Sequence, residues 1–187
     1  MGRLNPLTTN CSSLNKTIRL SKGWGPLQIV TMSSIGDRRG KMDLDDLNYE
    51  HRNYRRWEAY FQSKLANLLF STELNRRLVA SGGSIQSLAA HPGVAKTDLG
   101  SEGSSLTNRL LSPNTPFGSQ SAQAGALPAL RAATDPGAKG GEFYGPRWFF
   151  RGYPSKETPN KAAHDQASAE ALWRLSESLT NLSYAQR

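Results

Sequence analysis

One stretch of the chain limits its possible folds more than any other. Residues 57–79 contain neither glycine nor proline, and their composition favours a helix throughout. A short apolar run precedes this stretch at residues 27–32, another follows at 84–90, and each ends in turn-forming residues. A strand, a long helix and a second strand form a βαβ unit, in which the two strands lie parallel in one sheet. The sequence therefore predicts an α/β fold with a parallel sheet.

The rest of the chain is less regular. The first residues have no clear period and end in the turn-forming sequence Gly-Trp-Gly-Pro, so we separate an atypical segment, 1–26, from a body, 27–187. Within that body we expect four further elements. They are a short helix at 106–111, an alanine-rich helix at 121–133, a short strand at 141–145 and a closing amphipathic helix at 165–179.

Composition excludes several classes of protein. Hydrophobic residues make up 37% of the chain and charged residues 20%, as in globular rather than disordered proteins. A single cysteine and three histidines provide neither a disulfide framework nor the spacing of a metal site, so we expect no metal. No run is apolar enough to span a membrane or to serve as a secretory signal, so we expect a cytoplasmic protein.

The chain carries a net charge of +8, from 23 basic and 15 acidic residues. Residues 49–57 interleave aromatic rings with arginines, a pattern found on nucleic-acid-binding surfaces. Acidic residues such as Asp46 and Glu50 interrupt the basic stretch. A solvated basic loop is the simpler interpretation, and nucleic acid is not the partner we expect.

Two residues of the predicted long helix, Tyr60 and Lys64, lie one turn apart on the same face. Asn67 and Ser71 extend this polar stripe, and apolar residues cover both of its flanks. Such a helix is buried, either against the sheet or against a partner subunit. An ammonium group beside a phenol favours the phenolate, so Tyr60 is a candidate general acid or base. The spacing also occurs by chance, so its meaning depends on what surrounds it.

Polar residues end both predicted strands. Ser33 and Ser34 follow the first strand, and residues 91–97, which include a Pro-Gly turn, follow the second. The carboxyl ends of parallel strands open onto the ligand crevice of an α/β sheet, and a serine hydroxyl there can bind a substrate oxygen. Each feature alone is more often structural. Together with the helix stripe, they predict a site at one edge of the sheet.

These segments resemble the second half of the short-chain dehydrogenase/reductase family. The resemblance covers roughly residues 27–182. Within it, the loop at 45–48 and the helix at 62–70 are similar to those of the retinol-dehydrogenase-like branch. It implies a Rossmann-like, doubly wound parallel sheet, of which this chain would form the C-terminal half. The matching segments are Ile-Val-Thr-Met-Ser-Ser at 29–34, Tyr-Phe-Gln-Ser-Lys-Leu-Ala-Asn at 60–67 and His-Pro-Gly-Val-Ala-Lys-Thr at 91–97.

The resemblance also implies a reaction, the interconversion of an alcohol and a carbonyl with NAD or NADP. Ser34 would hold the substrate oxygen, Tyr60 would transfer the proton, and Lys64 would favour the phenolate and bind the nicotinamide ribose. The hydride would pass between the nicotinamide and the substrate carbon. The residues implied at the cofactor are Tyr60, Lys64, Pro92, Gly93 and Thr97.

Substrate and assembly follow from the same resemblance. The resemblance to this branch, together with the aromatic stretch at 143–153, suggests that the substrate is a small molecule, namely a bulky lipophilic alcohol or carbonyl compound. The apolar flanks of the helices at 57–79 and 165–179 suggest a homo-oligomer, because such helices form the usual dimer interface of the family.

The glycine-rich turn that binds the dinucleotide pyrophosphate in this family does not occur in the sequence. Two interpretations remain open. The chain is a fragment or truncated gene product, or it is a repurposed module that retains catalytic residues. The corresponding alternative to an oxidoreductase is a non-catalytic interaction or regulatory protein that uses its basic, partly apolar surface.

Overall fold

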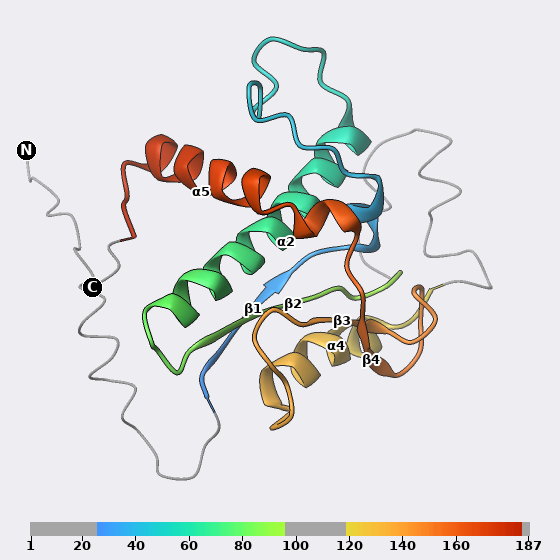
Figure 1. Ribbon diagram of the computed structural model, residues 1–187. Coiled ribbons are helices and arrows are strands. Elements are labelled where there is room, and N and C mark those ends of the chain that lie inside the picture. Colours follow the sequence, from blue (N-terminus) through green and yellow to red (C-terminus); the bar gives the residue numbers. More distant parts are fainter. Residues whose placement is uncertain (1–25, 96–118, 185–187) are drawn as a thin grey trace, which may run out of the picture.

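The computed structural model describes residues 26–95 and 119–184 as an α/β arrangement of strands and helices (Figure 1). The predicted strand, long helix and strand are all present, with bounds within two residues of those expected. Thr97, the helix expected at 106–111 and nearly all of segment 1–26 lie outside the described residues. The elements are β1 (Gln28–Met32), η1 (Ile35–Arg39), α2 (Arg56–Ala80), β2 (Gln86–Ala90), α4 (Ala122–Thr134), β3 (Phe143–Pro146), β4 (Pro154–Glu157), η3 (Lys161–His164) and α5 (Gln166–Thr180).

The strands form one sheet in the order β1-β2-β3-β4. Strands β1 and β2 are parallel neighbours in register from Gln28 opposite Gln86 to Met32 opposite Ala90, which confirms the predicted βαβ unit. Strand β3 is also parallel to β2, so the predicted parallel sheet is confirmed for three strands, and β4, which we did not expect, runs antiparallel to β3 at the edge. The sequence hid β4 because it is short and begins with Pro154, a residue tolerated at the start of an edge strand.

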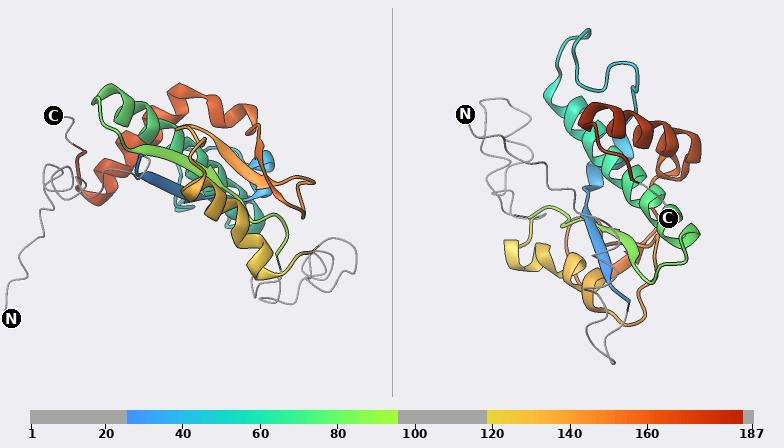
Figure 2. Two further views of the ribbon diagram at one scale, coloured as in Figure 1. Left: turned by 90° about the horizontal axis from the view of Figure 1, so that it is seen from below. Right: turned by 90° about the vertical axis from the view of Figure 1, so that its left-hand side faces the viewer.

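Helices cover both faces of this sheet, as Figure 2 shows. Ala89 of β2 and Phe143 of β3 pack with residues of α2 and α5. Their neighbours Ala90 and Tyr144 belong to a second cluster that includes Ala132 of α4. Because successive side chains of a strand point to opposite faces, α2 and α5 lie on one side and α4 on the other. The fold is therefore the expected doubly wound α/β type.

Helix α5 packs along α2 and covers part of its apolar flank. Glu73 of α2 is 1% exposed and contacts Arg76 and Arg77, and its hydrogen bonds to these arginines lower the pKa of its carboxyl. The ring of Trp173 on α5 stacks on that of Phe70, with centroids 5.6 Å apart. Part of the apolar flank of α2, which we expected to form the contact between subunits, therefore packs against α5 of the same chain. The oligomeric state remains a prediction.

The basic stretch around residue 52 is neutralised by its own loop. The guanidinium of Arg52 lies 2.9 Å from the carboxylate of Asp43 and 3.6 Å from that of Asp46. It also lies 3.8 Å from the ring centroid of Tyr49 and donates to the amide oxygen of Gln62 at 2.7 Å. These contacts agree with a folded basic loop and leave Arg52 engaged within the chain. Among the described helices, none combines the length and apolar character that crossing a membrane requires.

Candidate active site

The two serines after β1 have different structural roles. The hydroxyl of Ser33 donates to the backbone carbonyl of Lys64 at 2.8 Å, so this serine fixes the strand end to helix α2. The hydroxyl of Ser34 instead accepts a hydrogen bond from the amide of Gly36 at 3.1 Å and caps η1. A hydroxyl that accepts still has its own proton to donate. Ser34, the serine assigned to substrate, can therefore still donate to a substrate oxygen.

The polar stripe of α2 faces the sheet. The amide of Asn67 donates to the carbonyl of Met32 at 2.8 Å, and the hydroxyls of Ser71 and Ser87 lie 3.0 Å apart. These contacts tie α2 to both β1 and β2. Of the two alternatives left by the sequence, burial against the sheet or against a partner subunit, the structure supports the sheet.

Tyr60 lies where η1 packs against α2. A Cβ placed on Gly36 would lie 2.7 Å from the ring of Phe61 and 3.3 Å from that of Tyr60. Only glycine therefore permits this approach, which brings the segment that follows Ser34 against the aromatic ring of Tyr60. The Trp57 ring contacts Tyr60 edge-on, with centroids 5.9 Å apart.

The ammonium of Lys64 lies 5.5 Å from the centroid of the Tyr60 ring. Both side chains are half-buried, and neither the Tyr60 hydroxyl nor the Lys64 ammonium hydrogen-bonds to another described residue. A phenol and an ammonium without such bonds are able to bind hydroxyl groups of a ligand, such as those of a ribose or a substrate. The structure brings together the elements that carry Ser34, Tyr60 and Lys64, while their chemical roles remain predictions.

The Pro92–Gly93 turn follows β2 at the same edge of the sheet. Gly93 has φ of +66°, and a Cβ there would lie 2.5 Å from the carbonyl oxygen of Phe150 and 2.6 Å from Pro146. The Pro92 carbonyl accepts from the Gln120 amide at 2.8 Å. The turn therefore requires glycine for both its conformation and its packing. Thr97, the other residue expected at the nicotinamide, lies outside the described residues.

A cluster of buried ionisable residues near this turn was not anticipated from the sequence. His91 is 0% exposed, and its Nε2 lies 3.2 Å from Oε1 of Glu157. Asp37 of η1 is 1% exposed, and burial raises the pKa of its carboxyl against the lowering effect of Arg38 and His91. No local pattern predicts this group, because its members lie on separate elements.

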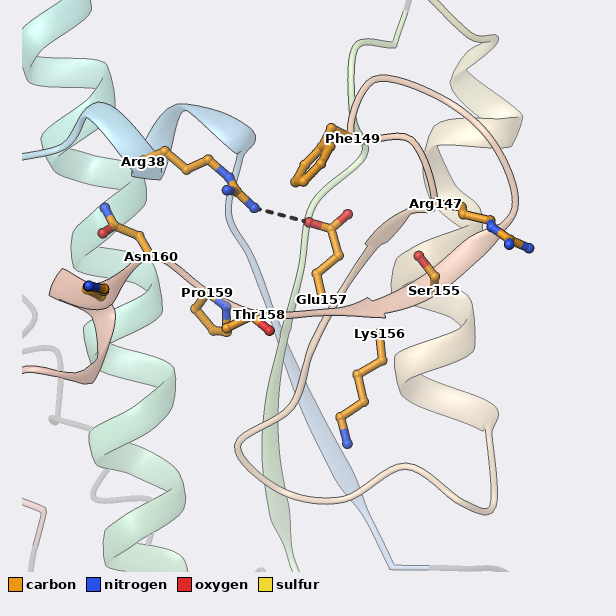
Figure 3. Close-up of a pocket in the computed structure, with 10 residues that line it drawn as sticks. Arg38, Arg147, Phe149, Ser155, Lys156, Glu157, Thr158, Pro159 and Asn160 are labelled. Carbon is orange, nitrogen blue, oxygen red and sulfur yellow. Dashed lines mark ion pairs between the residues drawn. The ribbon is translucent and has the colours of Figure 1, made fainter.

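A surface cavity of about 650 Å³ lies beside this group, and its lining includes none of the residues predicted for the site (Figure 3). In Figure 3 the carboxylate of Glu157 points toward Arg38, whose guanidinium lies 3.7 Å away. That guanidinium also lies 4.5 Å from the centroid of the Phe149 ring. The lining residues are Arg38, Arg147, Phe149, Ser155, Lys156, Glu157, Thr158, Pro159, Asn160 and Lys161.

Within residues 26–95 and 119–184, no cluster of three or more histidine, cysteine or acidic residues has the arrangement of a metal site.

Comparison with known proteins gives consistent relatives, although no family model matches the chain. The chain is 36% identical to retinol dehydrogenase 13 of Homo sapiens over 167 residues, which is 86% of this chain and 48% of that protein. It is 35% identical to human retinol dehydrogenase 12, over 81% of this chain and 45% of the relative. A WW domain-containing oxidoreductase of Danio rerio is 36% identical over 89% of this chain and 39% of its own length.

A solved structure from Mycobacterium Paratuberculosis, described as an uncharacterized protein, matches with a TM-score of 0.65 and 37% identity. The match covers 84% of this chain and 52% of that one. The chain thus spans about half the length of the curated relatives it matches, and the match falls on their C-terminal half.

Proposed function

Because the chain belongs to the short-chain dehydrogenase/reductase family, we propose that it forms the substrate-side half of an NAD(P)-dependent oxidoreductase. The reaction interconverts an alcohol and a carbonyl. The retinol dehydrogenases among its relatives support the class of reaction, and the residues at the carboxyl ends of β1 and β2 support its location.

Each residue of the proposed site has a separate task. In carbonyl reduction the hydroxyl of Ser34 donates to the carbonyl oxygen, and the hydroxyl of Tyr60 gives that oxygen its proton. In alcohol oxidation the hydroxyl of Ser34 donates to the substrate oxygen, and the phenolate of Tyr60 accepts the proton of the substrate hydroxyl. The ammonium of Lys64 stabilises the phenolate and holds the hydroxyls of the nicotinamide ribose. The nicotinamide, when bound, supplies or accepts the hydride.

The observation that carries this proposal is the different bonding of Ser33 and Ser34. Ser33 is occupied by the carbonyl of Lys64, and this bond fixes the strand end to the helix turn that carries the lysine. Ser34, one residue further, keeps its own donor proton, and Gly36, which donates to it, lies against the ring of Tyr60. The cap on η1 uses only the oxygen of Ser34, so the hydroxyl proton is left for a substrate oxygen.

The described surface near the Pro92–Gly93 turn supports a lipophilic substrate. The loop between β3 and β4 exposes Trp148 by 64% and Tyr153 by 83%. The amide of Val94 donates to the carbonyl of Phe150 at 2.9 Å, which joins this loop to the turn. Only part of the aromatic stretch at 143–153 is available, because Phe143 and Tyr144 are each 3% exposed in the core.

The direct test replaces Tyr60 with phenylalanine. Hydride transfer is measured with NADH and NADPH and a lipophilic aldehyde, using the chain alone and the chain supplied with the dinucleotide-binding half of a relative. Loss of the proton-transfer group should lower the rate by about 10²- to 10⁴-fold. The matched control is Tyr54→Phe, since Tyr54 is 68% exposed and lies before α2. Equal rates for Tyr60→Phe and Tyr54→Phe would refute the mechanism.

The alternative is a non-catalytic interaction module. Strand β1 has a partner on one side only among the described strands, and its Ile29 and Met32 are 41% and 40% exposed. Such an edge suits pairing with another chain. Calorimetric titration of the folded chain with NADH and NADPH separates the two proposals, because absence of nicotinamide binding favours the interaction module.

A further inference from the structure

The imidazole of His91 has a defined tautomer. The ring is 0% exposed and packs on Phe143, with ring centroids 5.2 Å apart. Its Nδ1 accepts a hydrogen bond from the backbone amide of Gly93 at 3.1 Å. A nitrogen that accepts carries no proton, so in the neutral ring the proton lies on Nε2. The tautomer is assigned from this hydrogen bond.

Nε2 lies close to a carboxylate from a distant part of the chain, although the two groups are not aligned as a hydrogen bond. Nε2 lies 3.2 Å from Oε1 of Glu157, whose side chain is 10% exposed. The approach depends on Gly145 of β3, because a Cβ at that position would collide with both the imidazole and the carboxylate. A negative charge beside Nε2 favours the tautomer with its proton on that nitrogen, which leaves Nδ1 as the acceptor.

Glu157 needs this contact as much as His91 does. No described residue donates a well-aligned hydrogen bond to either carboxylate oxygen of Glu157. The N–H groups near it are the imidazole N–H of His91 and the guanidinium of Arg38, the latter 3.7 Å away. A nearly buried carboxylate without good donors is costly unless it performs another task. Orienting the imidazole is a task that this geometry allows.

We propose that Glu157 is a positioning residue, which acts through His91 to fix the Pro92–Gly93 turn in the conformation that the nicotinamide requires. The contact of the turn with the nicotinamide rests on the proposed function. The fixing of the turn by Glu157 rests on the geometry of His91 and Glu157 alone. Glu157 fixes the His91 tautomer, and His91 in turn binds the Gly93 amide. Without the carboxylate, the tautomer with a proton on Nδ1 becomes accessible and the Gly93 amide loses its acceptor.

Nuclear magnetic resonance of the chain tests the interaction of Glu157, His91 and Gly93 without any catalytic assay. In the wild type, correlation of ring protons with ring nitrogens should show His91 with its proton on Nε2. Glu157→Met, which keeps the bulk but removes the carboxylate, should populate the other tautomer and speed hydrogen exchange at the Gly93 amide by about fivefold, the value of one ordinary hydrogen bond. Glu157→Gln keeps an acceptor oxygen and should restore both signals.

Glu142→Met is the matched control. The Glu142 side chain is 11% exposed, close to the 10% of Glu157, but it pairs with Lys156 and Tyr144 instead of His91. It should leave the His91 tautomer and the Gly93 exchange rate unchanged. A wild-type His91 with its proton on Nδ1 would overturn the proposal, and so would a Glu157→Met variant with unaltered His91 and Gly93 signals. If Glu157→Met does not fold, the wild-type tautomer and the Glu157→Gln signals decide.

Cofactor titration separates this inference from the proposed function. If the chain binds NADH or NADPH, Glu157→Met should weaken binding while Glu157→Gln and Glu142→Met retain it. If the wild type binds neither cofactor but Glu157→Met still alters the His91 and Gly93 signals, the positioning of the turn is supported and the proposed function is contradicted.

Discussion

The carboxyl ends of β1 and β2 lie at one edge of the sheet but are held by opposite kinds of interaction. Neutral hydrogen bonds from Ser33 and Asn67 hold the end of β1, and both link β1 to α2. Ionisable groups surround the end of β2, where His91 faces Glu157 of β4. The first end is stabilised within one βαβ unit, while the second depends on elements far along the chain.

This difference has an energetic consequence. A neutral hydrogen bond contributes about 0.5–1.5 kcal/mol and costs little to bury. Buried charges bring a large desolvation cost, which nearby opposite charges only partly offset. The end of β2 should therefore be more sensitive to substitution and to pH than the end of β1.

The largest expected effect is a loss of stability caused by a substitution at the end of β2. Gly93 and Gly82 have nearly the same φ, +66° and +67°, but a Cβ at Gly82 meets nothing within 4 Å. Gly82→Ala should cost only the strain of the left-handed conformation, about 1–3 kcal/mol. Gly93→Ala adds overpacking against Phe150 and Pro146, about 1–3 kcal/mol more. Urea unfolding measures both variants, and equal losses would show that the β2 end is not tightly packed.

A smaller loss of stability is expected from a substitution that affects only the end of β1. Asn67→Ala removes the bond to the Met32 carbonyl and should lower the free energy of unfolding by about 1 kcal/mol. Hydrogen exchange should quicken at the Ser33 amide, which donates to Ala90 at 2.7 Å, but not at Gly93. The control is Asn53→Ala, an exposed loop position. A change at Gly93 equal to that at Ser33 would mean that the two strand ends are not independent.

The smallest effect concerns pH. Burial raises the pKa of Asp37 above its usual 3.8, so its contribution to stability is full below pH 3.8 and is lost as pH rises through the folded value. Asp37→Asn should therefore stabilise the protein at neutral pH, with the difference vanishing in acid. The ionisable groups that influence Asp37 are Arg38 and His91, and neither is altered by this substitution.

Asp135→Asn provides a control of opposite sign. The Gly137 amide and Arg131 lower the pKa of Asp135, so its contribution is present above pH 3.8 and is lost as pH falls through the folded value. This variant should be destabilised at neutral pH and should approach the wild type in acid. Thermal unfolding at several pH values measures both variants. Curves of the same sign for Asp37→Asn and Asp135→Asn would contradict the assigned burial of Asp37.

The sequence predicted the regular elements because their signals are local. The Gly- and Pro-free stretch marked α2, and the helix expected at 165–179 begins where Asp165 caps α5 through the amides of Ala167 and Ser168. The same local pattern identified Tyr60 and Lys64, since two residues four apart share a helix face. It could not decide whether that face meets the sheet or another subunit.

The sequence alone determined the βαβ unit, the polar stripe of α2 with Tyr60 and Lys64, and the serine pair after β1, because each depends on spacing within a strand, a turn or a helix. The choice of Ser34 within that pair came from the family resemblance. Only the tertiary structure separated Ser33 from Ser34, added the antiparallel β4 and placed Glu157 beside His91. The Ser33–Lys64 and His91–Glu157 contacts join residues 31 and 66 positions apart. Burial and charge at such separations are set by how the layers pack, which no local period of the chain records.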